Sequence, residues 1–432
     1  MAIEAFFTLL FLLFALLFSG LWIGITLLVV GYVGLISFTS ISAGSVLSNV
    51  LWNQAANSTM LALPLFIFMG EVLVKSKIAD SLFLGLAPWV NRLPGGLLHV
   101  NTAACAFFAA VSGSVAATTA TVGGITIPEF RKRGYSDSLS IGTLACAGTL
   151  GILIPPSMPM LVYGFISSVS IGKLFIAGIM PGLALAVLFS GYVIVRCLIN
   201  PSLAPSQGDN FTWSDRMAGL PQLLPVILLI LTVLGSIYAG FATPTEAAAV
   251  GSFGAIVFAF WNKTLSAKVF TDALMGTVLT SCMIMLIVVG ASFFSVAIGY
   301  IGIPRALARF MVESEMSPYT LMVIVTLFYI VLGCLVDGFS IIVMSVPLVL
   351  PLIRAAGFDP LWFGIYLVLM VQVAQITPPV GFNLFVINGL DQRYSLGFIA
   401  RASCPMFLIM LLFTLLITVF PELILWLPGK IM

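Results

Sequence analysis

Two adjacent prolines interrupt a long apolar stretch of this chain, and the same interruption occurs twice, at Pro155-Pro156 and at Pro378-Pro379. Proline has no N–H donor and clashes with the preceding helical turn, so a Pro-Pro pair breaks a helix. Broken backbone at membrane depth is tolerated only where it is buried in protein or lines a water-filled cavity. Each pair therefore predicts a broken membrane helix that forms part of a binding site.

One constant offset relates the two halves of the chain. Adding 223 to a residue number takes Pro155 to Pro378, and the same offset holds over roughly thirty residues without a gap. It also pairs Pro128 with Pro351, Arg131 with Arg354 and Gly134 with Gly357. Such a shared offset predicts an internal duplication, with the two halves meeting near residues 200–220.

The composition excludes an ordinary soluble domain. Of the 432 residues, 61% are hydrophobic and only 7% are charged, whereas soluble domains are about 25% charged. The chain is therefore expected to be an all-α polytopic membrane protein. The six cysteines stand singly, the only histidine is His99, and no nucleophile–base pair or metal-ligand spacing is present. These absences argue against an enzyme or a transition-metal site, and a net charge of +2 gives no reason to expect nucleic acid as a partner.

Two segments are too long for one ordinary span of about 20 residues and predict re-entrant hairpins. The first covers residues 95–128 and has a small, hydroxylated middle, with a tip expected near Ser112–Ser114. One straight span with a small-residue packing face is the alternative. The second covers residues 319–352 and has Asp337-Gly338 at its middle. Each hairpin is followed by a broken helix, at 139–167 and at 361–390.

The remaining segments are assigned from their polarity. Residues 40–59 are expected to be a polar connection, and residues 79–91 and 305–315 are expected to be interfacial helices. The last span is expected at 405–426. The first hairpin is followed by three basic residues from Arg131, whereas its counterpart in the second half carries only Arg354. By the positive-inside rule, this asymmetry predicts inverted repeats with both termini outside.

The two tips and the two breaks are expected to meet near the membrane midplane, where they offer carbonyls, hydroxyls and half-helix ends. Oxygen ligands alone suit Na⁺, although they leave proton coupling through Asp337 open. The predicted Na⁺ ligands are Ser112, Gly113, Ser114, Thr149, Gly151 and Pro155 in the first half, and Asp337, Gly338, Gln375, Thr377 and Pro378 in the second. The predicted substrate-binding residues are Ser157, Thr119 and Asn383.

Two acidic residues have alternative interpretations. Asp337 lies deep in an apolar run, where a carboxylate costs on the order of 3 kcal/mol on insertion scales. It is expected either to bind the ion or substrate or to cap a helix, and both roles are compatible. Glu246 follows Thr243 and Pro244 in the pattern of a helix start, so a capping role is favoured over a catalytic one.

Several motifs together resemble the large membrane subunit of tripartite ATP-independent periplasmic (TRAP) transporters, over essentially the whole chain. The similar motifs begin with Ser112-Gly-Ser-Val-Ala-Ala-Thr-Thr-Ala120, Ile127-Pro-Glu-Phe130 and Gly148-Thr-Leu-Gly-Ile-Leu-Ile-Pro-Pro-Ser157. They continue with Phe241-Ala-Thr-Pro-Thr-Glu-Ala247 and Ile376-Thr-Pro-Pro-Val-Gly381. Each motif alone is weak, whereas the joint pattern is specific.

The resemblance implies a bacterial inner-membrane secondary transporter that takes up organic acids by an elevator mechanism driven by a Na⁺ gradient. It implies a separate small membrane subunit and a periplasmic substrate-binding protein as partners. Sialic acid is the first candidate substrate and a C4-dicarboxylate the alternative. A stand-alone cation-coupled dicarboxylate carrier remains a further alternative, and a channel-like or structural membrane subunit is a different class.

The same resemblance suggests a division into scaffold and transport parts. Residues 1–94 would form scaffold helices and a first arm helix, and residues 95–170 the first half of the transport domain. Residues 171–318 would contain scaffold helices, the linker 200–219 and a second arm helix. Residues 319–390 would form the second half of the transport domain, and residues 391–432 a C-terminal transmembrane helix.

Overall fold

The computed structural model describes residues 2–76, 78–205, 212–379 and 381–431, without the side chains of 78–81, 83 and 84. Every regular element among these residues is a helix. Seven helices are long and apolar enough to cross a membrane, which fits the predicted all-α polytopic membrane protein.

The first half contains ten α-helices and two short 3-10 helices, followed by a third 3-10 helix, η3 (Pro201–Leu203). They are α1 (Ala2–Phe18), α2 (Ile23–Phe38), α3 (Ala43–Ala55), η1 (Ser58–Leu61), α4 (Ala62–Lys75), α5 (Ile78–Val90), α6 (Leu98–Ser112), α7 (Val115–Lys132), α8 (Asp137–Gly148), η2 (Thr149–Ile152), α9 (Met158–Ser167) and α10 (Ile171–Ile199).

The second half follows the same plan. Its helices are α11 (Trp213–Tyr238), α12 (Pro244–Trp261), α13 (Ala267–Ile301), α14 (Ile303–Glu313), α15 (Pro318–Gly333), α16 (Gly338–Ala355), α17 (Pro360–Gln375), α18 (Phe382–Leu390), α19 (Leu396–Val419) and α20 (Glu422–Ile431). The offset of 223 carries both ends of α7 onto both ends of α16, so the duplication read from the sequence extends to the helix boundaries.

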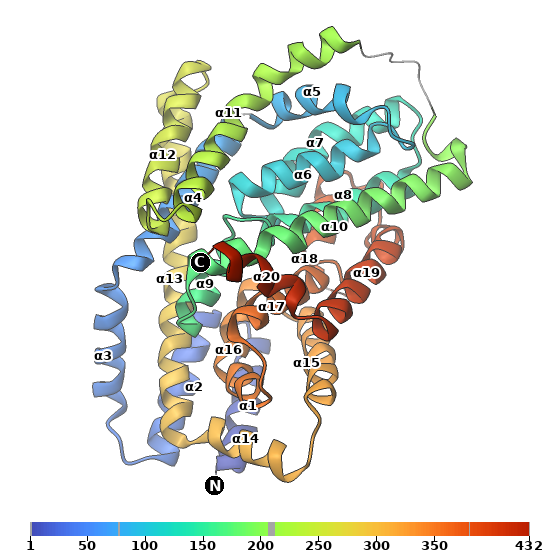
Figure 1. Cartoon of the computed structure of the whole chain (residues 1–432). Helices are drawn as coiled ribbons and strands as arrows, with labels where there is room; N and C mark the ends of the chain where they lie inside the picture. Colours follow the sequence, from blue (N-terminus) through green and yellow to red (C-terminus); the bar gives the residue numbers. More distant parts are fainter. Residues whose placement is uncertain (1, 77, 206–211, 380, 432) are drawn as a thin grey trace.

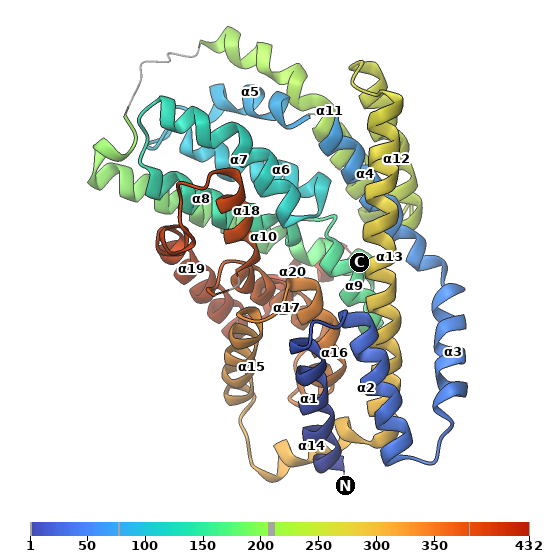
Figure 2. The same cartoon turned by 180° about the vertical axis from the view of Figure 1, so that it is seen from behind.

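Paired elements lie at opposite ends of the molecule. In Figure 1, α5 lies in the upper part and its counterpart α14 at the lower end, and α11 and α12 lie above their counterparts α1 and α2. The view from behind in Figure 2 shows the same arrangement. Opposite placement of equivalent helices is the arrangement that an inverted-topology repeat produces.

The two hairpins and the two breaks form as predicted. α6 and α7 are separated only by Gly113 and Ser114, so the first segment is a hairpin and the straight span is excluded. α15 and α16 form the second hairpin around residues 334–337. Both Pro-Pro bonds are cis, and each separates two short helices of a broken pair.

Two segments differ from the sequence-based expectation. Residues 40–59 are not only a connection, because Ser42 caps a 13-residue helix, α3, within them. The predicted single helix at the C-terminus is two helices, since α19 ends at Val419 and α20 begins at Glu422. Pro421 explains the division, because the residue before a proline is disfavoured in helical conformation, and Phe420 is extended there, with φ −123° and ψ 75°.

The remaining helices hold these hairpins in place. α2 packs closely along α13, where the helix backbones cross at Gly24 and Gly290. α17 runs through the centre of the fold, and its Trp362, Phe363 and Tyr366 are fully buried. Glu246 and Thr243 form the predicted capping box at the start of α12.

Candidate functional site

The first hairpin turns at Gly113, which has a φ of +58° in the left-handed region that favours glycine. Ser114 caps α7, since its hydroxyl accepts a hydrogen bond from the N–H of Ala117 at 3.4 Å. The hydroxyls of Ser112 and Thr118 share a hydrogen bond of 2.9 Å. The tip is therefore a short turn that presents hydroxyl groups at the N-terminus of α7.

The first break follows the end of α8 at Gly148. The Thr149 hydroxyl donates to the carbonyl of Cys146 at 2.7 Å. The Ser157 hydroxyl donates to the carbonyl of Ile152 and caps α9. Because a hydroxyl oxygen has two lone pairs, both side chains retain acceptor capacity for a cation or a polar ligand.

This tip and this break lie against each other. A Cβ atom added at Gly113 would lie 3.1 Å from the carbonyl oxygen of Pro156, and one added at Gly151 would lie 3.0 Å from the carbonyl oxygen of Ser114. Only glycine allows the backbones to come this close. The contact brings backbone oxygens from two non-helical segments to one place, as in cation sites built from unwound helices.

The second tip is capped by Asp337. Its carboxylate accepts hydrogen bonds from the N–H of Phe339 at 3.0 Å, from the N–H of Ser340 at 3.4 Å and from the Ser340 hydroxyl. Asp337 therefore has the capping role that was one of its two predicted roles. The residue is exposed, and a role in ion binding stays a prediction.

The second tip also lies against the second break. The Cys334 S–H donates to the carbonyl of Pro378 at 3.1 Å. A Cβ atom added at Gly338 would lie 2.8 Å from Nε2 of Gln375. The Thr377 hydroxyl donates to the carbonyl of Val373 at 2.7 Å. The predicted ligands of the second half thus gather at one tip-and-break contact, as those of the first half do.

Two buried side-chain amides of the second half form hydrogen bonds with the first half, next to its break. This region is called the junction below. Nε2 of Gln372 donates to the carbonyl of Thr149 at 2.9 Å, and these residues are 223 apart, so each is the repeat counterpart of the other. Nδ2 of Asn383 donates to the carbonyl of Ala145 at 2.6 Å. The Thr119 side chain lies over Gly148, which also adjoins the Asn383 amide. Thr119 and Asn383 therefore lie together, whereas the Ser157 hydroxyl is bonded elsewhere, and the role of all three in substrate binding stays a prediction.

Three buried oxygens around this junction are left without hydrogen-bond partners among the described residues. They are Oε1 of Gln372, Oδ1 of Asn383 and Oγ1 of Thr119. Buried polar atoms in native proteins are usually satisfied, so unpaired ones mark a place for a ligand, an ion or water. Gln372 was not predicted from the sequence, although its spacing of 223 from Thr149 was the available signal.

Among the described residues, the tips and breaks contain no basic side chain. Arg131 and Arg354 lie in the last turns of α7 and α16, away from the tips. Arg131 bonds Asp391 at 2.6 Å and Arg354 bonds the carbonyl of Ser167 at 3.3 Å. The N-termini of α7, α9, α16 and α18 begin at the tips and breaks, and helix N-termini carry partial positive charge. The described residues also contain no cluster of three potential metal-binding His, Cys, Asp or Glu side chains.

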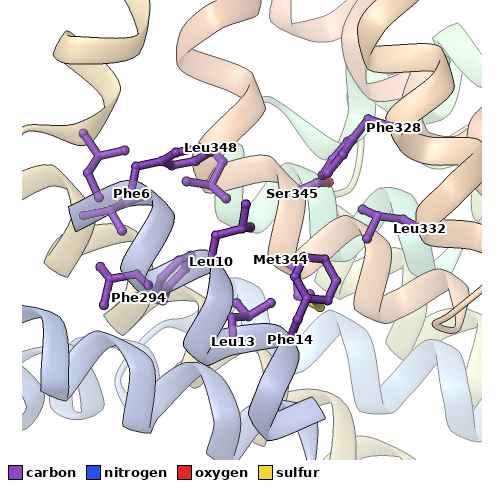
Figure 3. Close-up of a pocket in the computed structure, with 13 residues that line it drawn as sticks. Phe6, Leu10, Leu13, Phe14, Phe294, Phe328, Leu332, Met344, Ser345 and Leu348 are labelled. Atoms are coloured by element: carbon purple, nitrogen blue, oxygen red, sulfur yellow. The ribbon is translucent and has the colours of Figure 1, made fainter. Parts of the chain in front are cut away.

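A separate small apolar cavity of about 20 Å³ lies between α1 and the second hairpin. Figure 3 shows Leu10, Leu13 and Phe14 of α1 facing Phe328, Met344 and other side chains of α15 and α16. Its polar lining side chain is Ser345, whose hydroxyl accepts a bond from Tyr329 at 3.0 Å. This lining does not suit a carboxylate, so the cavity marks an apolar contact surface.

A neighbouring cavity of about 260 Å³ reaches the second tip. It is lined by Phe14, Leu17, Phe18, Gly20, Leu21 and Ile23 on one side and by Leu335, Val336 and Asp337 on the other. The second tip is thus open toward the turn between α1 and α2. The first tip is enclosed, since Ser112 and Gly113 are buried.

An all-helical membrane fold with two inverted halves, each with a hairpin and a broken helix, is typical of membrane transporters. Residues 10–423 match the family model described as "Tripartite ATP-independent periplasmic transporter, DctM component". The chain belongs to this family, the large membrane subunits of TRAP transporters. It is a transporter subunit of the inner membrane that works with a small membrane subunit and a periplasmic binding protein for carboxylate substrates.

Curated relatives with different named substrates are about equally similar. The C4-dicarboxylate TRAP transporter large permease of Pseudomonas aeruginosa is 33% identical over 382 residues, covering 88% of each chain. The sialic acid TRAP transporter large permease of Vibrio cholerae is 30% identical over 420 residues, covering 96% of each. The ectoine TRAP transporter large permease of Halomonas elongata is 32% identical over 375 residues, covering 86% of each.

Two solved transporters share the fold. The Alcanivorax borkumensis YdaH transporter has a TM-score of 0.59 at 16% identity and covers 89% of this chain and 88% of its own. Neisseria gonorrhoeae MtrF has a TM-score of 0.55 at 14% identity and covers 85% of this chain and 82% of its own. At such low identities the likeness concerns the fold alone.

Proposed function

We propose that this chain carries out Na⁺-coupled uptake of an organic acid, by an elevator movement of the hairpins and broken helices against the other helices. The observation that carries the proposal is the pair of tip-and-break contacts related by the repeat. Each gathers backbone carbonyls and hydroxyls at helix ends, and Gln372 joins one to the other through Thr149.

The charge of this region supports the proposal of Na⁺ coupling. An anionic substrate in a low-dielectric site needs compensating positive charge. Neither half-site contains a basic side chain, and Arg131 is bonded to Asp391 instead. Helix N-termini supply only partial charges. Cations bound at the two tips would therefore provide the charge that makes substrate binding favourable, which would couple the two fluxes.

Sialic acid is the first candidate substrate and a C4-dicarboxylate the alternative. The named substrates of the relatives include a dicarboxylate, sialic acid and ectoine, and each of these molecules carries a carboxylate. The unpaired amide oxygens of Gln372 and Asn383 accept hydrogen bonds and therefore fit hydroxyl or N–H groups of a substrate, whereas the Thr119 hydroxyl can donate to its carboxylate.

An elevator movement is supported by the surface between α1 and the second hairpin. The cavity there is lined by apolar side chains from α1, α13, α14, α15 and α16, except for Ser345 (Figure 3). A surface without interlocking polar bonds offers little resistance to sliding, because hydrophobic contact is non-directional.

The test is uptake of labelled sialic acid into proteoliposomes, with the Na⁺ gradient, the small subunit and the binding protein each omitted in turn. Uptake that requires all three is the expected result. Uptake without a Na⁺ gradient would remove the coupling proposal. Uptake of a dicarboxylate but not of sialic acid would replace sialic acid by the dicarboxylate as the proposed substrate and would leave the proposal of Na⁺ coupling unchanged.

Substitutions of the two capping residues at the tips test the proposed ion sites directly. We expect Ser114→Ala and Asp337→Ala each to shift the Na⁺ dependence of uptake to higher concentration, because each variant changes oxygen groups at one tip. Losing a cap also costs about 1 kcal/mol of helix stability. Thr243→Ala, which removes the cap of α12 and belongs to neither tip, is the matched control for that loss. Unchanged Na⁺ titration curves for both tip variants would exclude these side chains from coupling.

A further inference from the structure

The pseudo-symmetry of the fold is broken where the first half has an interrupted element and the second half has a continuous one. In the second half, α13 is a single helix of 35 residues. Adding 223 to the numbers of α3, η1 and α4 places all three within or beside this helix. The counterpart segment in the first half is interrupted by Ala56 and Asn57, between α3 and η1.

The interruption lies well inside the length of α13. Nε2 of Gln54, in the last turn of α3, donates to the hydroxyl of Ser292 on α13 at 2.6 Å. Ser292 lies nine residues before the end of α13 at Ile301, which is about 14 Å along a helix. Figures 1 and 2 both show α3 lying lengthwise beside the lower part of α13. The interruption is therefore at the depth of apolar membrane helices.

The outer surface of the interruption is polar. Four exposed side chains there are amides or hydroxyls, namely Asn53, Asn57, Ser58 and Thr59. The counterpart residues of α13, 276–282, instead expose Val278, Leu279 and Cys282. The α13 stretch has the composition of a surface that faces lipid, and the α3–η1 stretch does not.

Such a surface is costly in a bilayer. Backbone that is neither helical nor part of a closed sheet does not face lipid within the hydrocarbon region. Exposed amides at that depth are equally unfavourable, and in membrane proteins they are typically paired across helix–helix contacts. The side-chain oxygen of Asn57 accepts a hydrogen bond from the N–H of Thr59 at 3.0 Å. The side chains of Asn53, Ser58 and Thr59 are exposed.

We propose that the break between α3 and η1 is a docking surface for a transmembrane helix of the small membrane subunit. The family has such a partner, and this surface supplies what a partner helix needs. Exposed Leu51, Trp52 and Leu61 flank the polar groups and offer apolar contact area. The four polar side chains offer hydrogen bonds, which in lipid drive helices together. The partner helix is expected to be apolar overall, to carry hydroxyl or amide groups at this level, and to need no charge.

Photocrosslinking with the assembled complex tests the location. A benzophenone amino acid is placed at Asn53 or Asn57, and at Met275 or Leu279 as matched exposed positions of the other repeat. The small subunit is co-expressed with an affinity tag. Crosslinks to the small subunit from 53 and 57 and none from 275 and 279 are expected. Crosslinks only from the α13 positions, or none from 53 and 57 in a complex that co-purifies, would overturn the proposal.

A substitution tests the polar groups themselves. Asn53→Leu removes an exposed amide while keeping an α3 residue of similar size. We expect it to weaken co-purification of the small subunit about fivefold, the loss of one interhelical hydrogen bond. The thermal stability of the large subunit without its partner should stay unchanged. Leu279→Ala is the control and should leave co-purification at the wild-type level. Equal retention of the small subunit by Asn53→Leu and the control would show that the amide takes no part.

Discussion

Gln372 illustrates how much one side chain connects in this fold. It is fully buried, its amide nitrogen bonds the carbonyl of Thr149 in the other half, and its amide oxygen has no partner among the described residues. The bond ties the first break to the helix that precedes the second break. A single amide thus lies where the two repeats, and the two predicted ion sites, come together.

Replacing this amide should be costly. Gln372→Met keeps the length of the side chain but removes the hydrogen bond to the Thr149 carbonyl, and a buried hydrogen bond contributes about 0.5–1.5 kcal/mol. We expect a lower thermal midpoint of the purified protein and reduced uptake at every Na⁺ concentration. Thr277→Val is the control, because its buried hydroxyl bonds only its own helix, at Ala273. A Gln372→Met protein with wild-type stability and uptake would show that the bond contributes little.

Single elements of the fold depend on glycine where helices cross. α2 and α13 approach so closely that a Cβ atom at Gly290 would collide with the carbonyl oxygen of Gly24. Backbone contact of this kind increases van der Waals packing between membrane helices, for which no hydrophobic driving force exists in lipid. The crossing anchors α2 on the longest helix of the protein.

The close contact between α2 and α13 predicts that alanine substitutions at two glycines of α13 affect stability differently. Gly290→Ala should destabilise the protein by about 1–3 kcal/mol, because the added methyl group forces the two backbones apart. Gly299→Ala has open space around the added atom and should be neutral or stabilising, since alanine favours helix over glycine by about 1 kcal/mol. Thermal unfolding in detergent compares the two variants. Similar unfolding midpoints for both variants would mean that α2 moves away from α13 without a loss of stability.

At the scale of the whole molecule, side-chain hydrogen bonds and ion pairs connect the hairpins and the broken helices to one another. At one end, Arg131 bonds Asp391 and Tyr394, and Tyr394 bonds Asp137. At the repeat-related position, Arg354 bonds the carbonyl of Ser167. The contact between α1 and the second hairpin is apolar instead. This distribution is consistent with a rigid unit, formed by the hairpins and the broken helices, that moves against α1.

A crosslink across that contact should stop transport. In a cysteine-free background, Leu13→Cys with Met344→Cys places two thiols on opposite walls of the cavity in Figure 3. We expect a short bifunctional thiol reagent to abolish uptake, and a reducible version to allow recovery on reduction. Tyr329→Cys with Ser345→Cys lies within one hairpin and should leave uptake unchanged after crosslinking. Full uptake by the crosslinked Leu13–Met344 pair would contradict an elevator movement at this surface.

Much of the architecture was predictable because its signals are local. A Pro-Pro pair removes backbone donors wherever it occurs, so both breaks were visible in the sequence. The hairpins followed from segments too long for one span, and the capping box at Thr243 and Glu246 from residue types at a fixed spacing. The helix α3 was missed because its sequence is polar at 45, 48, 49, 53 and 54, and only packing against α2 and α13 explains why it is helical.

The sequence by itself determined an all-helical membrane protein made of two related halves, because apolar run length, helix breakers and a constant offset are properties of the chain alone. The tertiary structure decided which groups meet. It brought Gln372 to Thr149 and placed Thr119 beside Asn383. These contacts join segments far apart in the chain, and helical periodicity carries no information about which distant backbone carbonyl an amide will reach.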